Sequence, residues 1–150
     1  MAQYFTKDGL QALKDELHEL KTNEMRRIVK LISEAAAFGD LKENSAYHEA
    51  RNMKSFLLGR IEQLENAINE SVVVEKKAGG AIQVGSKITI LFGSDKENYH
   101  IVAPTEADIL KNKISYQAPL GSQLMGRKEG DEFNYEIKDK KIKVKVVKID

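Results

Sequence analysis

Two apolar stripes at helical spacing constrain the fold of this chain more than any other feature. The second stripe ends near Ser71, and both advance in steps of three and four residues. Two amphipathic helices joined by only a few residues must cover each other's apolar faces, so the pattern predicts an antiparallel helical hairpin. The first stripe is Leu10, Leu13, Leu17, Leu20, Ile28, Ile32 and Ala35; the second is Ala46, Ala50, Met53, Leu57, Ile61, Leu64 and Ile68.

The ends of the two helices carry recognisable signals. Thr6 is a candidate N-cap for the first helix. The apolar stripe then shifts by one position near Glu24, so its seam drifts around the helix instead of keeping a strict heptad. Gly39 marks the turn, where the chain needs a left-handed or open backbone to reverse. Arms of about 30 residues at 1.5 Å per residue would be roughly 40 to 45 Å long.

After the stretch "VVVEKKAGGAIQVG" the pattern changes to short strand-like runs separated by turns. "PLGSQLMG" reads as a short helix opened by Pro119. The prediction is therefore an α+β chain with a helical hairpin at 1–76, a linker at 77–82 and a β-rich domain at 83–150. The runs are "SKITILF", "NYHIVA", "NKISYQA", "DEFNYEI" and "KIKVKVVKI".

Composition excludes several classes of protein. With no cysteine, the chain has no disulfide, thiolate zinc site or cysteine nucleophile. The N-terminus lacks a signal-peptide core, and no window approaches the roughly 18 apolar residues of a membrane span. We expect a soluble, cytoplasmic monomer with no membrane partner.

Charge is unevenly distributed along the hairpin although the net charge is only +1. Residues 1–20 and 61–75 carry two basic and eight acidic side chains, whereas residues 21–60 carry eight basic and five acidic ones. A basic projecting arm suits an acidic channel or nucleic acid, because cations attract phosphates at long range. The alternative is that an exposed two-helix rod needs charges for solubility.

The turn itself, "FGDLKEN", places Asp40 and Glu43 three residues apart. That spacing is typical of a capping box at the start of the second helix. Alternatively, the two carboxylates face outward and suit Mg²⁺, which takes only one or two protein carboxylates and fills its other positions with water and phosphate. Two acids alone form a weak site, but they become useful when carried to a phosphodiester-cleaving centre that supplies further ligands.

The segment "GDLKENSAYHEAR", with "TKDGLQALKDELHELK" before it and "GRIEQLENAI" after it, closely resembles the bacterial Gre transcript-cleavage factors, of the GreA type. The resemblance continues through "VGSKITI", "YHIVAPTEAD" and "KISYQAPLGSQLMGRKEGDEF", in the expected order and over nearly the whole chain. It implies an N-terminal coiled-coil hairpin and a C-terminal domain of FKBP-like fold.

The resemblance also implies an activity. In this family the hairpin enters the secondary channel of RNA polymerase and the second domain docks near the channel rim. The factor then stimulates the polymerase's own cleavage of backtracked RNA 3′ ends, so it is not itself an enzyme. By family position, Asp40 and Glu43 hold a second Mg²⁺ and help position the attacking water. This Mg²⁺ is supplied and mainly held by the polymerase, and the free protein binds none tightly.

Further residues take roles from the same resemblance. Gly39, Asn44 and Tyr47 would support the turn. Arg51 and Lys54 would contact the extruded RNA, or would simply be solvated surface. The docking candidates Pro119, Leu120 and Leu124 include two leucines that fit core packing equally well.

The chain departs from the family pattern at four positions. Ala46 stands where the family usually has Glu, Ala36 where Arg is frequent, Arg26 where Pro is common, and Ala118 where Ser usually precedes the proline. None of these changes removes either acid of the turn.

Three other functions remain open from the sequence. A Gre-like homologue could occupy the channel and inhibit transcription without cleavage. A prolyl isomerase or chaperone would need an apolar, aromatic-lined pocket, yet the second half has no Trp and its Phe92 and Phe133 are isolated. A plain coiled-coil module would use "DLKE" only as a cap. His48 and His100 have no partner at metal-ligand spacing and are expected to be ordinary surface or strand residues.

Overall fold

The computed structural model describes residues 1–77 and 79–150. The chain forms two compact units: residues 11–69, and residues 1–10 together with 70–150. The segment predicted as a linker, 77–82, includes Ala78, which lies outside the described residues. Among the described residues, no helix is both long enough and apolar enough to cross a membrane.

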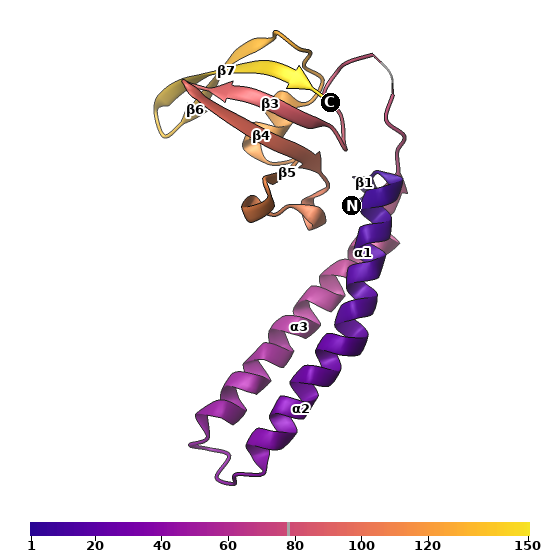
Figure 1. Cartoon of the computed structure of the whole chain (residues 1–150), viewed down its shortest axis with the longest axis vertical. Coiled ribbons are helices and arrows are strands. Elements are labelled where there is room, and N and C mark those ends of the chain that lie inside the picture. The colour runs from indigo at the N-terminus through magenta and orange to yellow at the C-terminus, as the bar shows by residue number, and fades with distance from the viewer. Residues whose placement is uncertain (78) are drawn as a thin grey trace. The chain divides into compact units, whose positions relative to one another are not determined.

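The predicted hairpin is present as two antiparallel arms (Figure 1). The first arm is continuous from Lys7 to Ala36, and the second is a single helix of 25 residues. At 1.5 Å per residue the arms are roughly 45 and 37 Å long. Thr6 caps the first helix as predicted, because its Oγ1 accepts a hydrogen bond from the backbone N–H of Gly9 at 3.0 Å. The elements are α1 (Lys7–Glu19), η1 (Leu20–Glu24), α2 (Met25–Ala36) and α3 (Ser45–Asn69).

The segment η1 explains the one-position shift in the first apolar stripe. Leu20–Glu24 forms a π-helical turn, which holds one residue more than the α-helix around it. The extra residue keeps the positions before and after it on the same side of the arm. A buried cluster of Ile28, Leu57 and Ile61 therefore joins α2 to α3, and Leu17, from before the π turn, and Leu20, its first residue, pack against it.

The N-terminus adds an element that the sequence pattern did not predict. Strand β1 (Gln3–Phe5) pairs in parallel with β2 (Ser71–Val73), directly after α3 ends at Asn69. Phe5 is fully buried there. Strands of three residues are too short for a period of two to be visible in the sequence.

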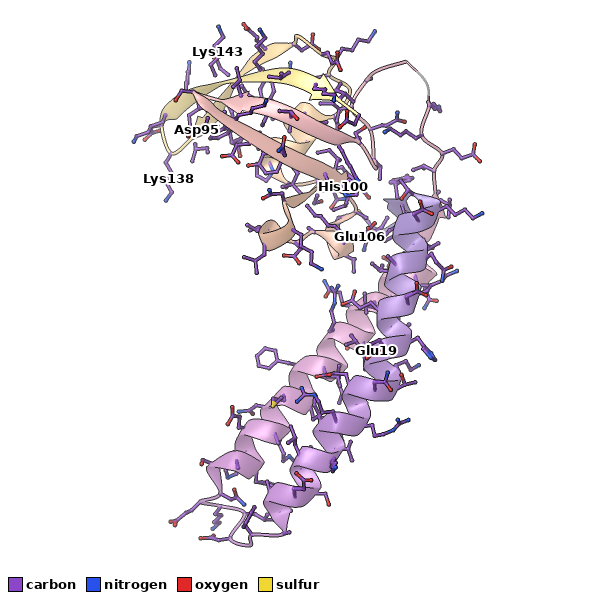
Figure 2. The ribbon with its side chains drawn as sticks, in the orientation of Figure 1. Glu19, Asp95, His100, Glu106, Lys138 and Lys143 are labelled. Carbon is purple, nitrogen blue, oxygen red and sulfur yellow. The ribbon has the colours of Figure 1, made fainter. Side chains whose placement is uncertain are left out.

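The C-terminal half forms a five-stranded mixed sheet in the order β5-β4-β3-β7-β6. All neighbours are antiparallel except β4 and β5. Charged side chains such as Lys143 project from its strands (Figure 2). The elements are β3 (Lys87–Phe92), β4 (Asp95–Val102), β5 (Lys113–Ser115), β6 (Glu132–Ile137) and β7 (Lys140–Ile149), with 3₁₀ turns η2 (Pro104–Glu106) and η3 (Ile109–Lys111) and helix α4 (Pro119–Leu124).

One face of this sheet carries the core. Ile90, Val144 and Val146 from adjacent strands are fully buried with Leu124 of α4, which Pro119 opens as predicted. Ile82 also belongs to this cluster, although the sequence placed it at the end of the linker. Its backbone N–H and C=O are bonded to Arg127 and Gly126, so the ordered domain begins before residue 83.

Candidate functional site

The turn between α2 and α3 is organised by one amide side chain, that of Asn44. Its Oδ1 accepts a hydrogen bond from the Tyr47 backbone N–H at 3.1 Å, which caps α3. Its Nδ2 donates to the carbonyl of Ala35 at 2.7 Å and to that of Gly39 at 3.4 Å. Asn44 therefore caps the second helix and ties it to the end of the first.

This arrangement corrects the predicted capping box. Helix α3 begins at Ser45, five residues after Asp40, so Asp40 is too early in the chain to be its N-cap. The reversal consumes more chain than expected because Gly39 and Asp40 both adopt left-handed backbone conformations, with φ of 79° and 45°. An amide also does what an ionised carboxylate cannot, since it accepts from one helix while donating to the other.

Because Asn44 caps α3, the two acids of the turn are left exposed to solvent. Asp40 and Glu43 are both exposed, and neither has a hydrogen bond or ion pair among residues 1–77 and 79–150. No group of three or more histidines and acids in that part of the chain is placed to hold a metal. Two carboxylates can contribute to an oxygen-ligated cation only if other ligands come from elsewhere.

The first two turns of α3 hold Arg51 in place. The Arg51 guanidinium donates from Nη1 to the Tyr47 hydroxyl at 3.0 Å, and its carbon lies 5.7 Å from the centre of the Tyr47 ring. Tyr47 is half-buried and meets the His48 ring edge-on at 5.7 Å. The Tyr47 phenol therefore holds a cation near the turn, and its role in supporting the turn stays a prediction. Lys54 follows on the same helix and is half-buried.

Sequence reasoning missed two features of the turn. The His48 Nε2 lies 2.9 Å from the carbonyl of Lys42, so this histidine closes the turn instead of standing free at the surface. Phe38 and Leu41 expose 87% and 47% of their surface, which leaves two apolar side chains beside the acids. Their position in "FGDL", outside both apolar stripes, was the available signal.

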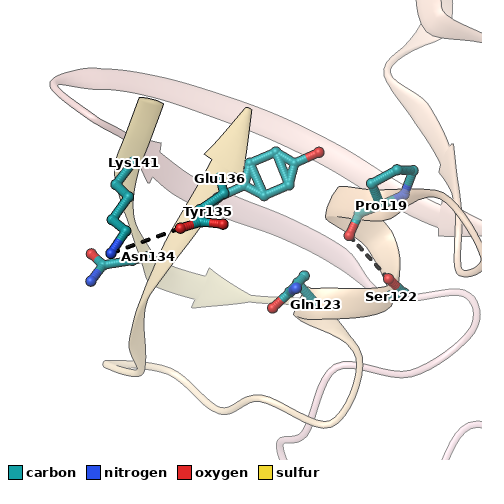
Figure 3. Close-up of a pocket in the computed structure, with 7 residues that line it drawn as sticks. All are labelled: Pro119, Ser122, Gln123, Asn134, Tyr135, Glu136 and Lys141. Atoms are coloured by element: carbon teal, nitrogen blue, oxygen red, sulfur yellow. Dashed lines mark hydrogen bonds and ion pairs between the residues drawn. The ribbon is translucent and has the colours of Figure 1, made fainter. Parts of the chain in front are cut away.

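The docking candidates in α4 divide into surface and core. Pro119 is exposed, Leu120 packs partly against the sheet core, and Leu124 is fully buried, which fits the core-packing alternative for this leucine. An open hollow of about 380 Å³ lies beside Pro119 (Figure 3). Its lining is mainly polar with Tyr135 as its one aromatic residue, which does not favour a prolyl isomerase pocket. The residues that line it are Pro119, Ser122, Gln123, Asn134, Tyr135, Glu136 and Lys141.

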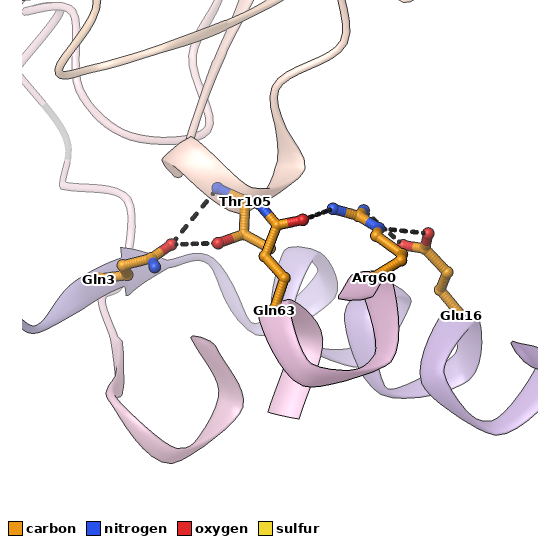
Figure 4. A network of polar contacts seen from close by, with 5 residues as sticks. All are labelled: Gln3, Glu16, Arg60, Gln63 and Thr105. Atoms are coloured by element: carbon orange, nitrogen blue, oxygen red, sulfur yellow. Dashed lines mark hydrogen bonds and ion pairs between the residues drawn. The ribbon is translucent and has the colours of Figure 1, made fainter. Parts of the chain in front are cut away.

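Further from the turn, ion pairs join the two arms. Arg60 of α3 donates to both carboxylate oxygens of Glu16 in α1, at 3.1 and 3.0 Å, and to Gln63 at 2.9 Å (Figure 4). Lys21 and Glu65 form a second pair across the arms at 3.4 Å. Arg27 and Lys30 of α2 are also paired, with Glu24 and Glu34 of the same arm.

The basic side chains near the turn contrast with this. Within the described ranges, no ion pair involves Arg26, Lys42, Arg51 or Lys54. The two ion pairs across the arms reduce the charge asymmetry seen in the sequence, because each joins a cation of residues 21–60 to an acid of residues 1–20 or 61–75. Positive charge without an acidic partner is concentrated beside two acids without a basic partner.

A helical hairpin with an exposed acidic turn and a curled mixed sheet together define a class of two-domain α+β proteins. Each half of the chain matches a family model of this class. Residues 3–73 match the family model "Transcription elongation factor, N-terminal", and residues 75–150 match "Transcription elongation factor, GreA/GreB, C-term". The chain belongs to the GreA/GreB family of transcription elongation factors and is of the GreA type.

Individual relatives agree over almost the full length. The chain is 40% identical to transcription elongation factor GreA of Acetivibrio thermocellus over 149 residues, which cover 96% of this chain and 93% of the relative. It is 39% identical to GreA of Clostridium acetobutylicum over 148 residues, covering 96% and 94%. A solved structure of the transcription factor Gfh1 shares the two-domain fold, at 25% identity and a TM-score of 0.50, covering 99% of this chain and 97% of that one.

Proposed function

We propose that this elongation factor binds RNA polymerase and stimulates the polymerase's own cleavage of backtracked RNA 3′ ends. The hairpin enters the channel through which the RNA end is extruded, and its turn carries Asp40 and Glu43 to the catalytic centre. The factor has no nuclease centre of its own and works in the cytoplasm, as a monomer, wherever the polymerase works.

The observation that carries this proposal is that the two acids do no structural work. A capping box would have bound Asp40 and Glu43 to backbone N–H groups, but Asn44 is the residue that accepts from the Tyr47 backbone N–H of α3, and its own amide donates to the carbonyls of Ala35 and Gly39. Both carboxylates are exposed at the far end of arms roughly 40 Å long. Exposed acids held at a defined turn are free to complete a metal site on another protein.

The chemistry asked of the acids is modest. Mg²⁺ keeps most of its water and needs only one or two carboxylates, so Asp40 and Glu43 would retain a second ion beside one held by the polymerase. That ion would lower the pKa of a bound water and orient it for attack on the phosphodiester. Arg51, fixed by Tyr47, and Lys54 would contact phosphates of the extruded RNA.

The second half of the chain supplies docking in this proposal. Residues 1–76 act as the inserted hairpin, 77–82 as the linker and 83–150 as the docking domain. Of the three docking candidates, exposed Pro119 and half-buried Leu120 offer surface to a partner, while Leu124 holds α4 on the sheet.

The test uses halted, backtracked RNA polymerase with labelled RNA and Mg²⁺. Wild-type protein should shorten the RNA from its 3′ end, whereas Asp40→Ala and Glu43→Ala should lose this stimulation while still competing with wild type for the polymerase. Glu49→Gln is the matched control, because Glu49 is an exposed acid of the same hairpin close to the turn. Normal cleavage by both alanine variants would refute the metal role. Binding that slows RNA extension without any cleavage would instead identify a channel-occupying inhibitor.

A further inference from the structure

A row of basic side chains crosses one end of the C-terminal sheet. In the strand register, Lys87 of β3 is opposite His100 of β4, and His100 is opposite Lys113 of β5. Directly opposed residues on adjacent strands project from the same face, so three nitrogen-bearing side chains lie next to one another. Lys87 and Lys113 thus flank the His100 ring, and each places a cation beside it.

Within the described residues, no acid forms an ion pair with Lys87, His100 or Lys113. Asp150 pairs through Oδ1 with Lys148 at 3.2 Å. Asp108, which bridges to Lys113 through its backbone, uses its Oδ1 to accept from the Leu110 N–H at 3.0 Å. Glu106 lies close enough to Lys113 for its pKa to be affected, but within the described residues the two form no ion pair.

At the other end of the same sheet, lysines are neutralised by glutamates of the neighbouring strand, and we call this region the self-neutralised end. There Lys143 pairs with Glu132 at 3.1 Å, and Lys141 pairs with Glu136 at 3.8 Å, both across β6 and β7. His100 and Lys143 are both labelled in Figure 2. Exposed lysines of this sheet are therefore paired where an acid lies across the strands, and the row at Lys87, His100 and Lys113 differs in having no such pair within the described residues.

An open hollow accompanies the row. It has a volume of about 520 Å³ and is lined by Lys87, His100 and Lys111, by the uncharged polar groups of Thr89, Asn98 and Asn112, and by one acid, Asp150, which is paired with Lys148. Lys113 is next to His100 in the row but does not line the hollow. Cations combined with hydroxyl and amide groups suit a tetrahedral oxyanion, which accepts several hydrogen bonds at once. We propose that this end of the sheet, where Lys87, His100 and Lys113 lie in one row, binds a phosphate group.

The electrostatic surroundings of His100 support the proposal. Partial burial lowers the pKa of this imidazole, and the nearby charges of Lys113, Lys87 and Lys76 lower it further, while a hydrogen bond with the Gly85 backbone acts in the opposite direction. The electrostatic potential at the ring is therefore positive. A bound phosphate would lower this potential and raise the pKa of His100. Binding would then become stronger as the pH falls, because the protonated ring attracts the phosphate.

The phosphate could belong to a nucleic-acid backbone or to a small phosphorylated molecule, and the test separates these sources. The full-length protein, with labelled histidine side chains, is titrated by NMR with inorganic pyrophosphate and, separately, with an eight-nucleotide single-stranded RNA. We expect saturable shifts of the His100 ring resonances, with those of His18 unchanged. Shifts with both probes identify a small-phosphate site, and shifts with RNA alone identify a backbone site.

Matched variants distinguish a site from general charge attraction. The double variant Lys87→Gln/Lys113→Gln should weaken binding about tenfold, because each lysine lost removes one phosphate contact. Lys141→Gln/Lys143→Gln removes the same charge from the self-neutralised end and should change affinity by less than about twofold. Circular dichroism confirms that both variants are folded. Equal losses in the two variants, or equal binding of polyglutamate, would overturn the proposal.

The pH arm uses RNA, because its phosphodiesters do not titrate near neutrality. Affinity should rise as the pH falls, and His100→Gln should abolish this rise while His48→Gln keeps it. A slope that survives in His100→Gln would contradict the site. No polymerase is present in these experiments, so their outcome is independent of the function proposed for the hairpin turn.

Discussion

The turn of the hairpin and the paired region of its arms are built from the same kinds of side chain but use them differently. In the arms, Arg60 and Glu16 neutralise each other across the helix interface, as do Lys21 and Glu65. At the turn, Asp40 and Glu43 have no basic partner within the described part of the chain, and an uncharged residue, Asn44, joins the two helices.

The difference separates charges that stabilise the hairpin from charges that are available to a partner in the function proposed above. A charge that stabilises the hairpin has a partner within it. A charge directed at another molecule must be left unpaired, and the helix ends must then be satisfied by some other group. Asn44 performs that task, which leaves the acids available.

The largest expected effect comes from disrupting the apolar contacts that hold the two arms together. Deletion of Ser55 from α3 should rotate the apolar residues on one side of the deletion by about 100°, since each residue of an α-helix turns the chain by that angle. Contacts of Leu57 and Ile61 with the first arm would be lost, and we expect the free energy of unfolding to fall by about 3 kcal/mol or more. Urea unfolding followed by circular dichroism measures this.

Deletion of Asn23 is the control for that experiment. Asn23 lies in the π turn, whose additional residue can be removed to leave a regular α-helix with both parts of the stripe still in phase. The cost should stay within about 1 kcal/mol. Equal losses for the two deletions would show that the π turn is not the cause of the stripe's shift.

The next effect concerns the turn itself. Asn44→Ala removes the cap of α3 and the bond to the Ala35 carbonyl, so it should lower the free energy of unfolding by about 1 to 2 kcal/mol. Asp40→Asn should change it by no more than about 0.5 kcal/mol, because the carboxylate has no bond to lose. Thermal melts of the two variants provide the comparison. A larger loss of stability for Asp40→Asn than for Asn44→Ala would show that Asp40 caps α3 after all.

A smaller effect is expected in the paired region of the arms. Glu16→Gln breaks the ion pair with Arg60 but keeps a side chain of similar size. Because both partners are about one-third exposed, the loss should be about 0.5 to 1 kcal/mol and should shrink in 1 M salt. A loss of the same size for Glu49→Gln, which has no ion pair within the described residues, would contradict the contrast between turn and arms.

The smallest effect is a pH dependence in the other unit of the chain. Burial raises the pKa of the Glu106 carboxyl, which lies against Gly9, while Lys113 partly opposes the rise. A raised carboxyl pKa means that the folded state loses stability as the pH rises through it. The free energy of unfolding of Glu106→Gln should therefore exceed that of wild type at pH 7. The difference should be less than about 1 kcal/mol, because solvent screens a partly exposed group. The gain should vanish near pH 4, and melting curves at both pH values test this sign.

Much of the fold was predictable because its signals are local or periodic. The two stripes predicted the hairpin, and the shift near Glu24 marked the π turn without identifying it. Thr6 and Pro119 correctly marked helix starts. The β1–β2 pair was not predictable, since it joins segments far apart in the sequence through strands of three residues.

The sequence predicted which residues form the candidate site, but it did not predict how they are arranged. Spacing alone favoured Asp40 and Glu43 as a capping box, and only the left-handed backbone at Gly39 and Asp40 shows that α3 starts too late for that. Nor could a sequence show that Leu124 is core, or that His100 shares a row with two lysines, because both depend on pairing between distant segments.

The dependence of RNA cleavage on Mg²⁺ concentration tests the central claim most directly. With backtracked polymerase, wild type is compared with Asp40→Asn and Glu43→Gln, which preserve shape and remove only the charge. If the turn supplies ligands to a second ion, both variants should need much more Mg²⁺ for half-maximal cleavage, while their affinity for the polymerase stays unchanged. The same Mg²⁺ requirement for all three proteins would contradict the claim that these acids hold the metal.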